Sequence, residues 1–338
     1  MPKNVQVLMR LFVSLAFLVV IVGCNAAAAQ TEVSGEWTGS LDQPNIHKEK
    51  RRTEKPDSNI DEQEVEDSVS DVTDTAKGDR LYLNFERRSS SNSHNMLGHT
   101  FAFSELQGLT REQVERGGPV KFSLAREAGT ISCEGSFQNR KGSGTFRFTA
   151  NASFISAMKS RGFDFEKTNS RWGHGDEPED KLFSAAALNV TTALADDLLS
   201  VGLGKLDVDD LFKAAIFKID SKFASEMKAS GFPNLDMEDL VKARIFKIDA
   251  AFVTQVMQMG FARESFEDLV KMRIFKVTPE FIAMARGEGL TNLSVEELVK
   301  MRIFKIDSDF IRKAHAEGVP LDVERLVERR IGARHREE

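Results

Sequence analysis

The feature that most constrains this chain is a sequence unit of 29 residues that recurs through its C-terminal half. Each copy contains Ile-Phe-Lys-Ile-Asp or a close variant, whose phenylalanine is Phe217, Phe246, Phe275 or Phe304. A unit of this length has room for two short helices and cannot bury its own apolar face, so neighbouring units have to stack. The spacing therefore predicts an array of two-helix repeats over residues 151–332, followed by a short tail at 333–338.

Capping residues divide each unit into a first and a second helix. Ser265 and Ser294 are each followed three residues later by an acid, the pattern of a capping box at the start of a first helix. The second helix is expected to begin at Asp220, Asp249, Thr278 or Asp307. It is expected to end at a left-handed glycine: Gly202, Gly231, Gly260, Gly289 or Gly318. Degenerate or partial units at both ends are expected to cap the array.

The preceding part of the chain alternates apolar and polar residues with a period of two. The runs, such as Leu81-Tyr82-Leu83 and Ile131 to Phe137, are separated by turn-forming residues, which predicts an antiparallel β domain over residues 31–150. Residues 42–78 interrupt it with eleven acidic and six basic residues, and we expect a disordered acidic insertion there. The expected fold class is α+β multidomain, an N-terminal antiparallel β domain followed by an α-helical repeat array.

Residues 1–24 have the features of a signal segment. Basic residues precede an apolar stretch, residues 11–23, whose length suits a signal sequence better than a membrane span. Cys24 follows this stretch directly, as in a bacterial lipobox, which predicts lipidation of Cys24 and a membrane anchor. The alternative is cleavage within residues 26–29 and release into the periplasm. Both alternatives predict an exported protein of the cell envelope.

Charge and cysteine content exclude several classes of function. A formal net charge of -6 argues against a nucleic-acid partner, which requires a dense basic surface. Cys133 is the one cysteine besides Cys24, and its strand-like surroundings predict a buried, unreactive thiol. No His-Glu-x-x-His motif occurs, and His94 and His99 lack metal-ligand spacing. We therefore expect no metal site and no cofactor.

One repeat, residues 268–282 with its closing Gly289, reads DLVKMRIFKVTPEFI over its central part. It resembles the "LVxLRIHGVTPEFI" repeats of bacterial exported proteins, which also carry an N-terminal β region and include fusions to antirepressor metallopeptidases. The resemblance implies a place in an envelope-sensing circuit, without an established activity. Phe275-Lys276 stands where that pattern has His-Gly, so no metal or pH-sensing role follows for this step.

Basic residues at equivalent positions of successive repeats are the candidate binding site. They are Lys218, Lys247, Lys276, Lys305, Arg244, Arg273 and Arg302. Stacking would align them in a ladder that could hold an acidic peptide or an anionic envelope polymer. The alternative is that they form ion pairs with the acidic first turns of neighbouring units. Those acids are Asp210, Glu238, Asp239, Glu267, Asp268, Glu296 and Glu297.

These observations predict a non-enzymatic envelope binding or scaffold protein whose repeats recognise a protein partner. Two alternatives act through the β domain. One is a carbohydrate- or lipid-binding protein with a ligand in a β cavity. The other is a hydrolase with catalytic carboxylates among Glu36, Glu105 and Glu134. A glycine-rich loop containing Trp172, His174 and Asp176 is a weaker candidate for a small site.

Overall fold

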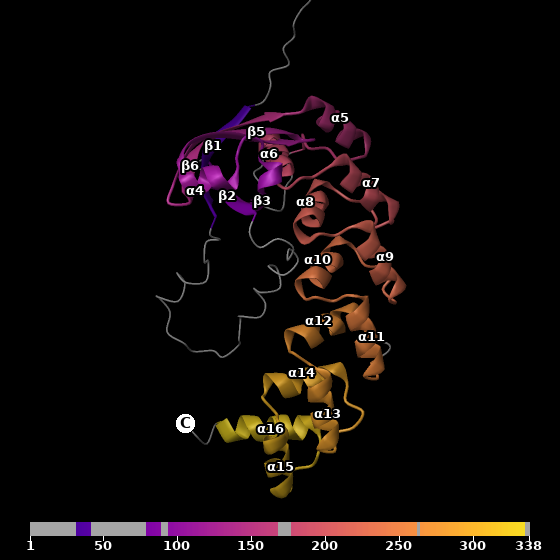
Figure 1. Ribbon diagram of the computed structural model, residues 1–338. Coiled ribbons are helices and arrows are strands. Elements are labelled where there is room, and N and C mark those ends of the chain that lie inside the picture. The colour runs from indigo at the N-terminus through magenta and orange to yellow at the C-terminus, as the bar shows by residue number, and fades with distance from the viewer. Residues whose placement is uncertain (1–31, 42–78, 89–93, 168–176, 262–263, 335–338) are drawn as a thin grey trace, which may run out of the picture.

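The computed structural model describes residues 32–41, 79–88, 94–167, 177–261 and 264–334. Within these ranges a six-stranded antiparallel sheet precedes a long stack of paired helices, which confirms the expected α+β class (Figure 1). The predictions made for Cys24, for the acidic insertion and for the loop containing Trp172 fall outside the described residues.

The sheet consists of two meanders joined through its first strand. Its strands are β1 (Glu32–Ser40), β2 (Arg80–Arg88), β3 (His94–Ala102), β4 (Gly118–Arg126), β5 (Gly129–Gln138) and β6 (Lys141–Ala150). Their spatial order is β3-β2-β1-β6-β5-β4. Trp37 of β1 pairs with Phe85 of β2 on one side and with Gly144 of β6 on the other. Between the meanders lie a turn, η3 (Phe103–Glu105), and the short helix α4 (Arg111–Arg116).

Helix α6 (Pro178–Ala187) covers the apolar face of the curved sheet (Figure 1). The ring of Phe183 lies 5.6 Å from Phe85, 5.0 Å from Phe146 and 5.7 Å from Phe148, measured between centroids. Although α6 is part of the repeat region in the sequence, it therefore belongs to the core of the β region. The interior that a lipid or carbohydrate carrier would need is occupied by this helix.

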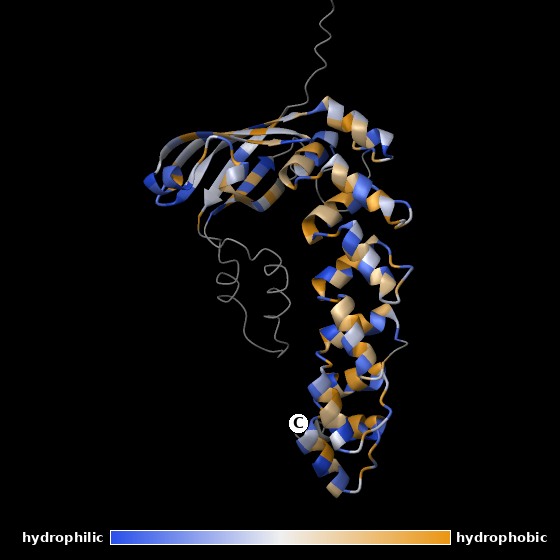
Figure 2. Cartoon of the chain, turned by 45° about the vertical axis from the view of Figure 1, so that its right-hand side comes forward, coloured by the Kyte–Doolittle hydropathy of each residue, from blue (hydrophilic) through white to orange (hydrophobic). Residues whose placement is uncertain are grey.

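The remaining helices form two parallel rows (Figure 1). The first-helix row contains α8 (Val208–Phe217), α10 (Met237–Ile245), α12 (Phe266–Ile274), α14 (Val295–Ile303) and α16 (Val323–Arg334). The second-helix row contains α5 (Ala152–Ser160), α7 (Thr192–Ser200), α9 (Ser221–Ala229), α11 (Ala250–Gln258), α13 (Pro279–Gly287) and α15 (Ser308–Ala316). Hydrophobic and hydrophilic residues are interspersed along the stacked helices (Figure 2). The buried residues of sheet and array form one continuous core.

The capping residues act as the sequence predicts. The hydroxyl oxygens of Ser265 and Ser294 accept hydrogen bonds from the backbone N–H groups of Asp268 and Glu297, at 3.1 and 3.2 Å. Asp249 caps α11 in the same way, accepting from the N–H of Phe252 at 2.8 Å. These local bonds satisfy donors that a helix start leaves open, which explains why helices of nine residues are sharply bounded here.

No single helix within the described residues is both long enough and apolar enough to cross a membrane. Helices α6 and α7 pass such a test only when taken together, and the chain bends by 88° between them.

Cys133 is buried in β5 with 1% of its surface exposed, as expected, and burial raises the pKa of its thiol to about 12. We expect iodoacetamide at pH 8 to modify it about 1000-fold more slowly in the folded than in the urea-unfolded protein, because the thiolate is the reactive form. Mass spectrometry of the Cys133 peptide measures both rates, and equal rates would contradict the assignment. The raised pKa contributes stability below the ordinary thiol pKa of 9.0, and this contribution is lost as the pH rises toward 12.

Candidate functional site

The arginines of the expected ladder contact the preceding repeat. Arg244 lies 3.7 Å above the ring of Phe223 and donates from Nη2 to the carbonyl oxygen of Lys218 at 2.6 Å. Arg273 repeats this arrangement one unit later, 3.7 Å above Phe252 and 2.7 Å from the carbonyl oxygen of Lys247. Burial lowers the pKa of both guanidinium groups. These contacts give the arginines a structural role between repeats.

The same contact continues to the end of the array. Arg302 lies 4.8 Å above Phe281 and donates from Nε to the carbonyl oxygen of Phe275 at 2.9 Å. Arg330 lies 3.8 Å above Phe310 and donates to the carbonyl oxygen of Lys305. Arg330 does not follow the 29-residue spacing, because the turn before α16 is one residue shorter and Arg330 comes 28 residues after Arg302.

The acidic first turns are paired with a different row of lysines. Lys213 contacts Asp210 at 3.0 Å and Glu238 of the next repeat at 2.5 Å. Three further lysines in the middle of the first helices behave similarly, through the pairs Lys242 with Glu267, Lys271 with Asp268 and Lys300 with Glu324. The hydrogen bond that Lys242 donates to Glu267 raises the pKa of Lys242. The ion pairing expected as the alternative therefore exists, but these mid-helix lysines supply its charges.

The four ladder lysines occupy the left-handed backbone region at the ends of the first helices. Their φ angles are 55° at Lys218, 51° at Lys247, 50° at Lys276 and 51° at Lys305. After α10, the N–H of Ile248 donates to the carbonyl of Ala243 at 2.8 Å and that of Lys247 donates to the carbonyl of Arg244 at 3.3 Å. This pair of bonds is the Schellman motif, in which the residue after the cap usually is glycine.

The second helices of the same repeats use glycine for the same motif. Gly231, Gly260 and Gly289 have φ angles of 110°, 100° and 91°. The N–H of Leu290 donates to the carbonyl of Ala285 at 3.0 Å, which matches the bond made by Ile248 after a first helix. Each repeat thus contains two equivalent turns, one closed by glycine and one by lysine. A lysine in this backbone region is destabilised by the contact of its Cβ with the following carbonyl.

Exposed isoleucines accompany these lysines. Ile274, Ile303 and Ile331 are 48%, 50% and 41% exposed at equivalent positions of α12, α14 and α16. Lys218, Lys247, Lys276 and Lys305 are all exposed. We call these seven residues the lysine face, which combines positive charge with apolar surface and recurs from repeat to repeat.

The first lysine of the lysine face, Lys218, lies beside the β domain. The pKa of His99 in β3 is lowered, first by burial of the imidazole and second by the positive charge of Lys218. This interaction places the first lysine of the face close to the edge strand of the sheet, so that the row starts beside the β region.

Of the three carboxylates considered for a hydrolase, Glu36 and Glu134 both pair in register with Thr145, from the two strands beside β6, whereas Glu105 lies in η3. Glu36 lies in a shallow hollow of about 330 Å³ on the outer face of the sheet. Glu134 is bound to Lys121 at 2.5 Å, and this hydrogen bond lowers its pKa, whereas a general acid needs a raised pKa. Glu105 lies in η3 and is paired with Arg126 at 2.5 Å.

Among the side chains that the structure describes, no group of three or more His, Cys, Asp or Glu residues could hold a metal ion. Comparisons with protein-family models, with curated proteins and with solved structures gave no match to this chain.

Proposed function

We propose that this protein is a non-enzymatic recognition protein of the cell envelope, whose helical array binds an acidic protein partner through the lysine face. In this proposal the array is the recognition surface and the β region is the base from which it extends. Export and lipidation at Cys24 would place both on a membrane surface, in an envelope-sensing circuit. The repeated exposure of lysine and isoleucine supports a partner that combines acidic and apolar side chains.

The observation that carries the proposal is the left-handed conformation of four exposed lysines in consecutive repeats. A non-glycine residue in this region costs roughly 1–2 kcal/mol. Glycine avoids this cost in the adjacent turns, at Gly231, Gly260 and Gly289, so the fold does not require lysine there. Lysine occurs at four equivalent positions despite this conformational cost. The best explanation is a contact between the lysine side chains and a binding partner.

Attraction between lysine and the helix dipole is a weaker explanation. A cation near a helix C-terminus contributes about 0.3–1 kcal/mol. The last turn of α10 already contains Lys242 and Arg244, and that of α14 contains Lys300 and Arg302. These residues already interact with the negative end of the helix dipole, so the lysine that follows the cap is not needed for this purpose.

The test replaces Lys247, Lys276 and Lys305 together with glycine. Because glycine suits this backbone, the free energy of unfolding should stay equal or rise, by up to about 1 kcal/mol per site. Affinity for the partner should fall about tenfold or more, because three positive charges are lost from the interface. Partners are captured on tagged full-length protein from detergent-solubilised envelopes, identified by mass spectrometry, and their binding to both forms is then measured.

The matched control replaces three exposed lysines outside the lysine face, Lys205, Lys222 and Lys313, with alanine. A partner retained by this control and lost from the glycine variant supports the proposal. A partner held equally by both variants would contradict it. Removing the array is not a suitable control, because a deletion that reaches α6 also removes part of the core of the sheet.

A further inference from the structure

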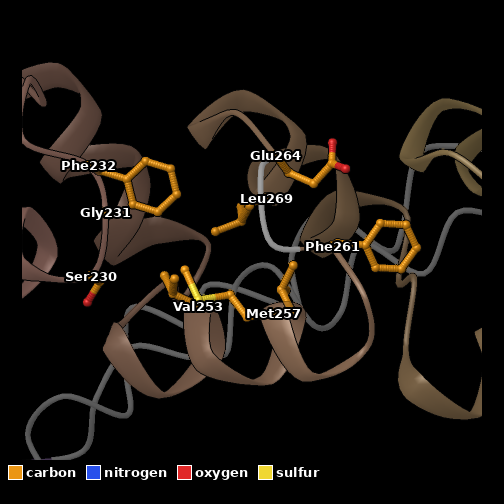
Figure 3. A pocket seen from close by; sticks show the side chains of 9 residues that line it. Ser230, Gly231, Phe232, Val253, Met257, Phe261, Glu264 and Leu269 are labelled. Carbon is orange, nitrogen blue, oxygen red and sulfur yellow. The ribbon is translucent and has the colours of Figure 1, made fainter.

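A pocket of about 200 Å³ opens between the repeats of α9 and α11, on the side of the array where these second helices end (Figure 3). Phe232, Val253, Val256, Met257 and Leu269 supply its apolar lining, and Glu264 lies at its rim. Met257 is 42% exposed, an unusual environment for a large apolar side chain.

The pocket lies in a repeat whose turn before the first helix has no leucine at the position where four other turns have one. Four other turns of this kind have leucine directly before the residue that caps the next first helix: Leu206, Leu235, Leu293 and Leu321. Leu206 and Leu235 are buried, at 9% and 8% exposure, Leu293 is partly buried, and Leu321 in the last of these turns is 37% exposed. Glu264 occupies the equivalent position before Ser265. In this repeat a carboxylate thus lines the hollow, at the position where the two preceding repeats have a buried leucine.

Two features of the rim favour a positive charge. Among the residues that the structure describes, none forms a hydrogen bond or ion pair with the carboxylate of Glu264, which points away from the apolar floor (Figure 3). Ser230 and Gly231, at the C-terminal end of α9, form the opposite side of the pocket. A helix C-terminus carries partial negative charge, so both sides of the rim attract a cation while the floor accepts an aliphatic group.

We propose that this pocket binds a segment of a partner polypeptide in which a leucine side chain is followed by a basic residue. The leucine fills the space that the array's own leucine fills in other repeats. The basic side chain of the partner segment forms an ion pair with Glu264 at the rim. The site lies apart from the lysine face and uses none of its residues, so either proposal can fail alone.

The test titrates the full chain with the capped pentapeptide Ala-Leu-Lys-Ala-Ala and follows the ε-methyl NMR signal of Met257. We expect a saturable shift. Peptides Ala-Ala-Lys-Ala-Ala and Ala-Leu-Glu-Ala-Ala should each bind at least threefold more weakly, because the first loses the apolar group and the second reverses the charge. Equal responses to all three peptides would overturn the proposal. So would a Met257 signal that changes with protein concentration alone, which would assign the pocket to a second copy of the chain.

Two variants separate binding from folding. Glu264→Leu restores the residue of the other repeats, so the midpoint of thermal unfolding should rise while the response to the peptide is lost. Glu264→Lys should prefer the glutamate peptide over the lysine peptide. Glu280→Gln, which changes an exposed carboxylate outside the pocket, should bind as the parent does. A Glu264→Leu protein that still binds the lysine peptide with parental affinity would overturn the proposal.

Discussion

Replacing Phe183 with alanine is expected to lower the free energy of unfolding by about 3–5 kcal/mol, the usual cost of removing a large aromatic side chain from a core. Phe183 is 7% exposed and contacts the rings of Phe85, Phe146 and Phe148, which come from two strands of the sheet. The cost should fall at the upper end of this range, because rigid strands cannot close the cavity between them. The loss of stability should affect both the sheet and the helical array, since α6 packs on the sheet and directly precedes the helices of the array.

Urea denaturation followed by far-ultraviolet circular dichroism measures this change. Leu199→Ala is the control, because Leu199 is an apolar residue in the neighbouring helix α7 that is 45% exposed. Its effect should stay within about 0.5 kcal/mol. If Phe183→Ala and Leu199→Ala shifted the transition equally, α6 would not be a part of the sheet core.

Replacing Arg273 with alanine is expected to destabilise the array by about 2–4 kcal/mol. A hydrogen bond from a charged donor contributes about 1.5–3 kcal/mol, and stacking of a guanidinium on an aromatic ring adds about 0.5–2 kcal/mol. Both contacts of Arg273 reach the preceding repeat, to the carbonyl of Lys247 and the ring of Phe252. In a stacked array such a contact is part of the coupling between neighbours, so its loss should make unfolding less cooperative.

Denaturation of Arg273→Ala and Arg273→Lys separates the two contributions. Lysine keeps the charge but lacks the planar group, so its effect should be intermediate. Arg325→Ala is the control, because Arg325 is 62% exposed and its contact with Glu328 lies within one helix. It should change the free energy of unfolding by less than about 1 kcal/mol. An Arg273→Ala protein as stable as this control would show that the arginine contacts do not couple the repeats.

Much of the fold could be predicted from local patterns. The capping boxes at Ser265 and Ser294 and the glycine-closed second helices involve residues only a few positions apart, so sequence spacing is enough to recognise them. The placement of α6 could not be predicted in this way. Its alternation with the other helices assigns it to the array, and only the packing of Phe183 against distant strands shows that it also covers the sheet.

The candidate site was predicted in part. The periodicity of the chain identifies the basic residues of each repeat but does not distinguish their roles. Arg244, Arg273 and Arg302 contact the preceding repeat, whereas lysines in the middle of the first helices pair with the acidic first turns. One signal could have separated them: Lys276 stands where the resembling repeats have glycine, which points to a left-handed residue.

The sequence by itself determined the repeat length, the two helices of each unit and the strands before them, because these depend on interactions between residues close together in the chain. Tertiary structure alone decided that α6 covers the sheet, that arginines join successive repeats and that a pocket lined by Glu264 opens beside Met257. Each of these depends on which distant surfaces meet and on the space left between them. Such contacts arise only when the helices and strands pack together, so no local pattern in the chain records them.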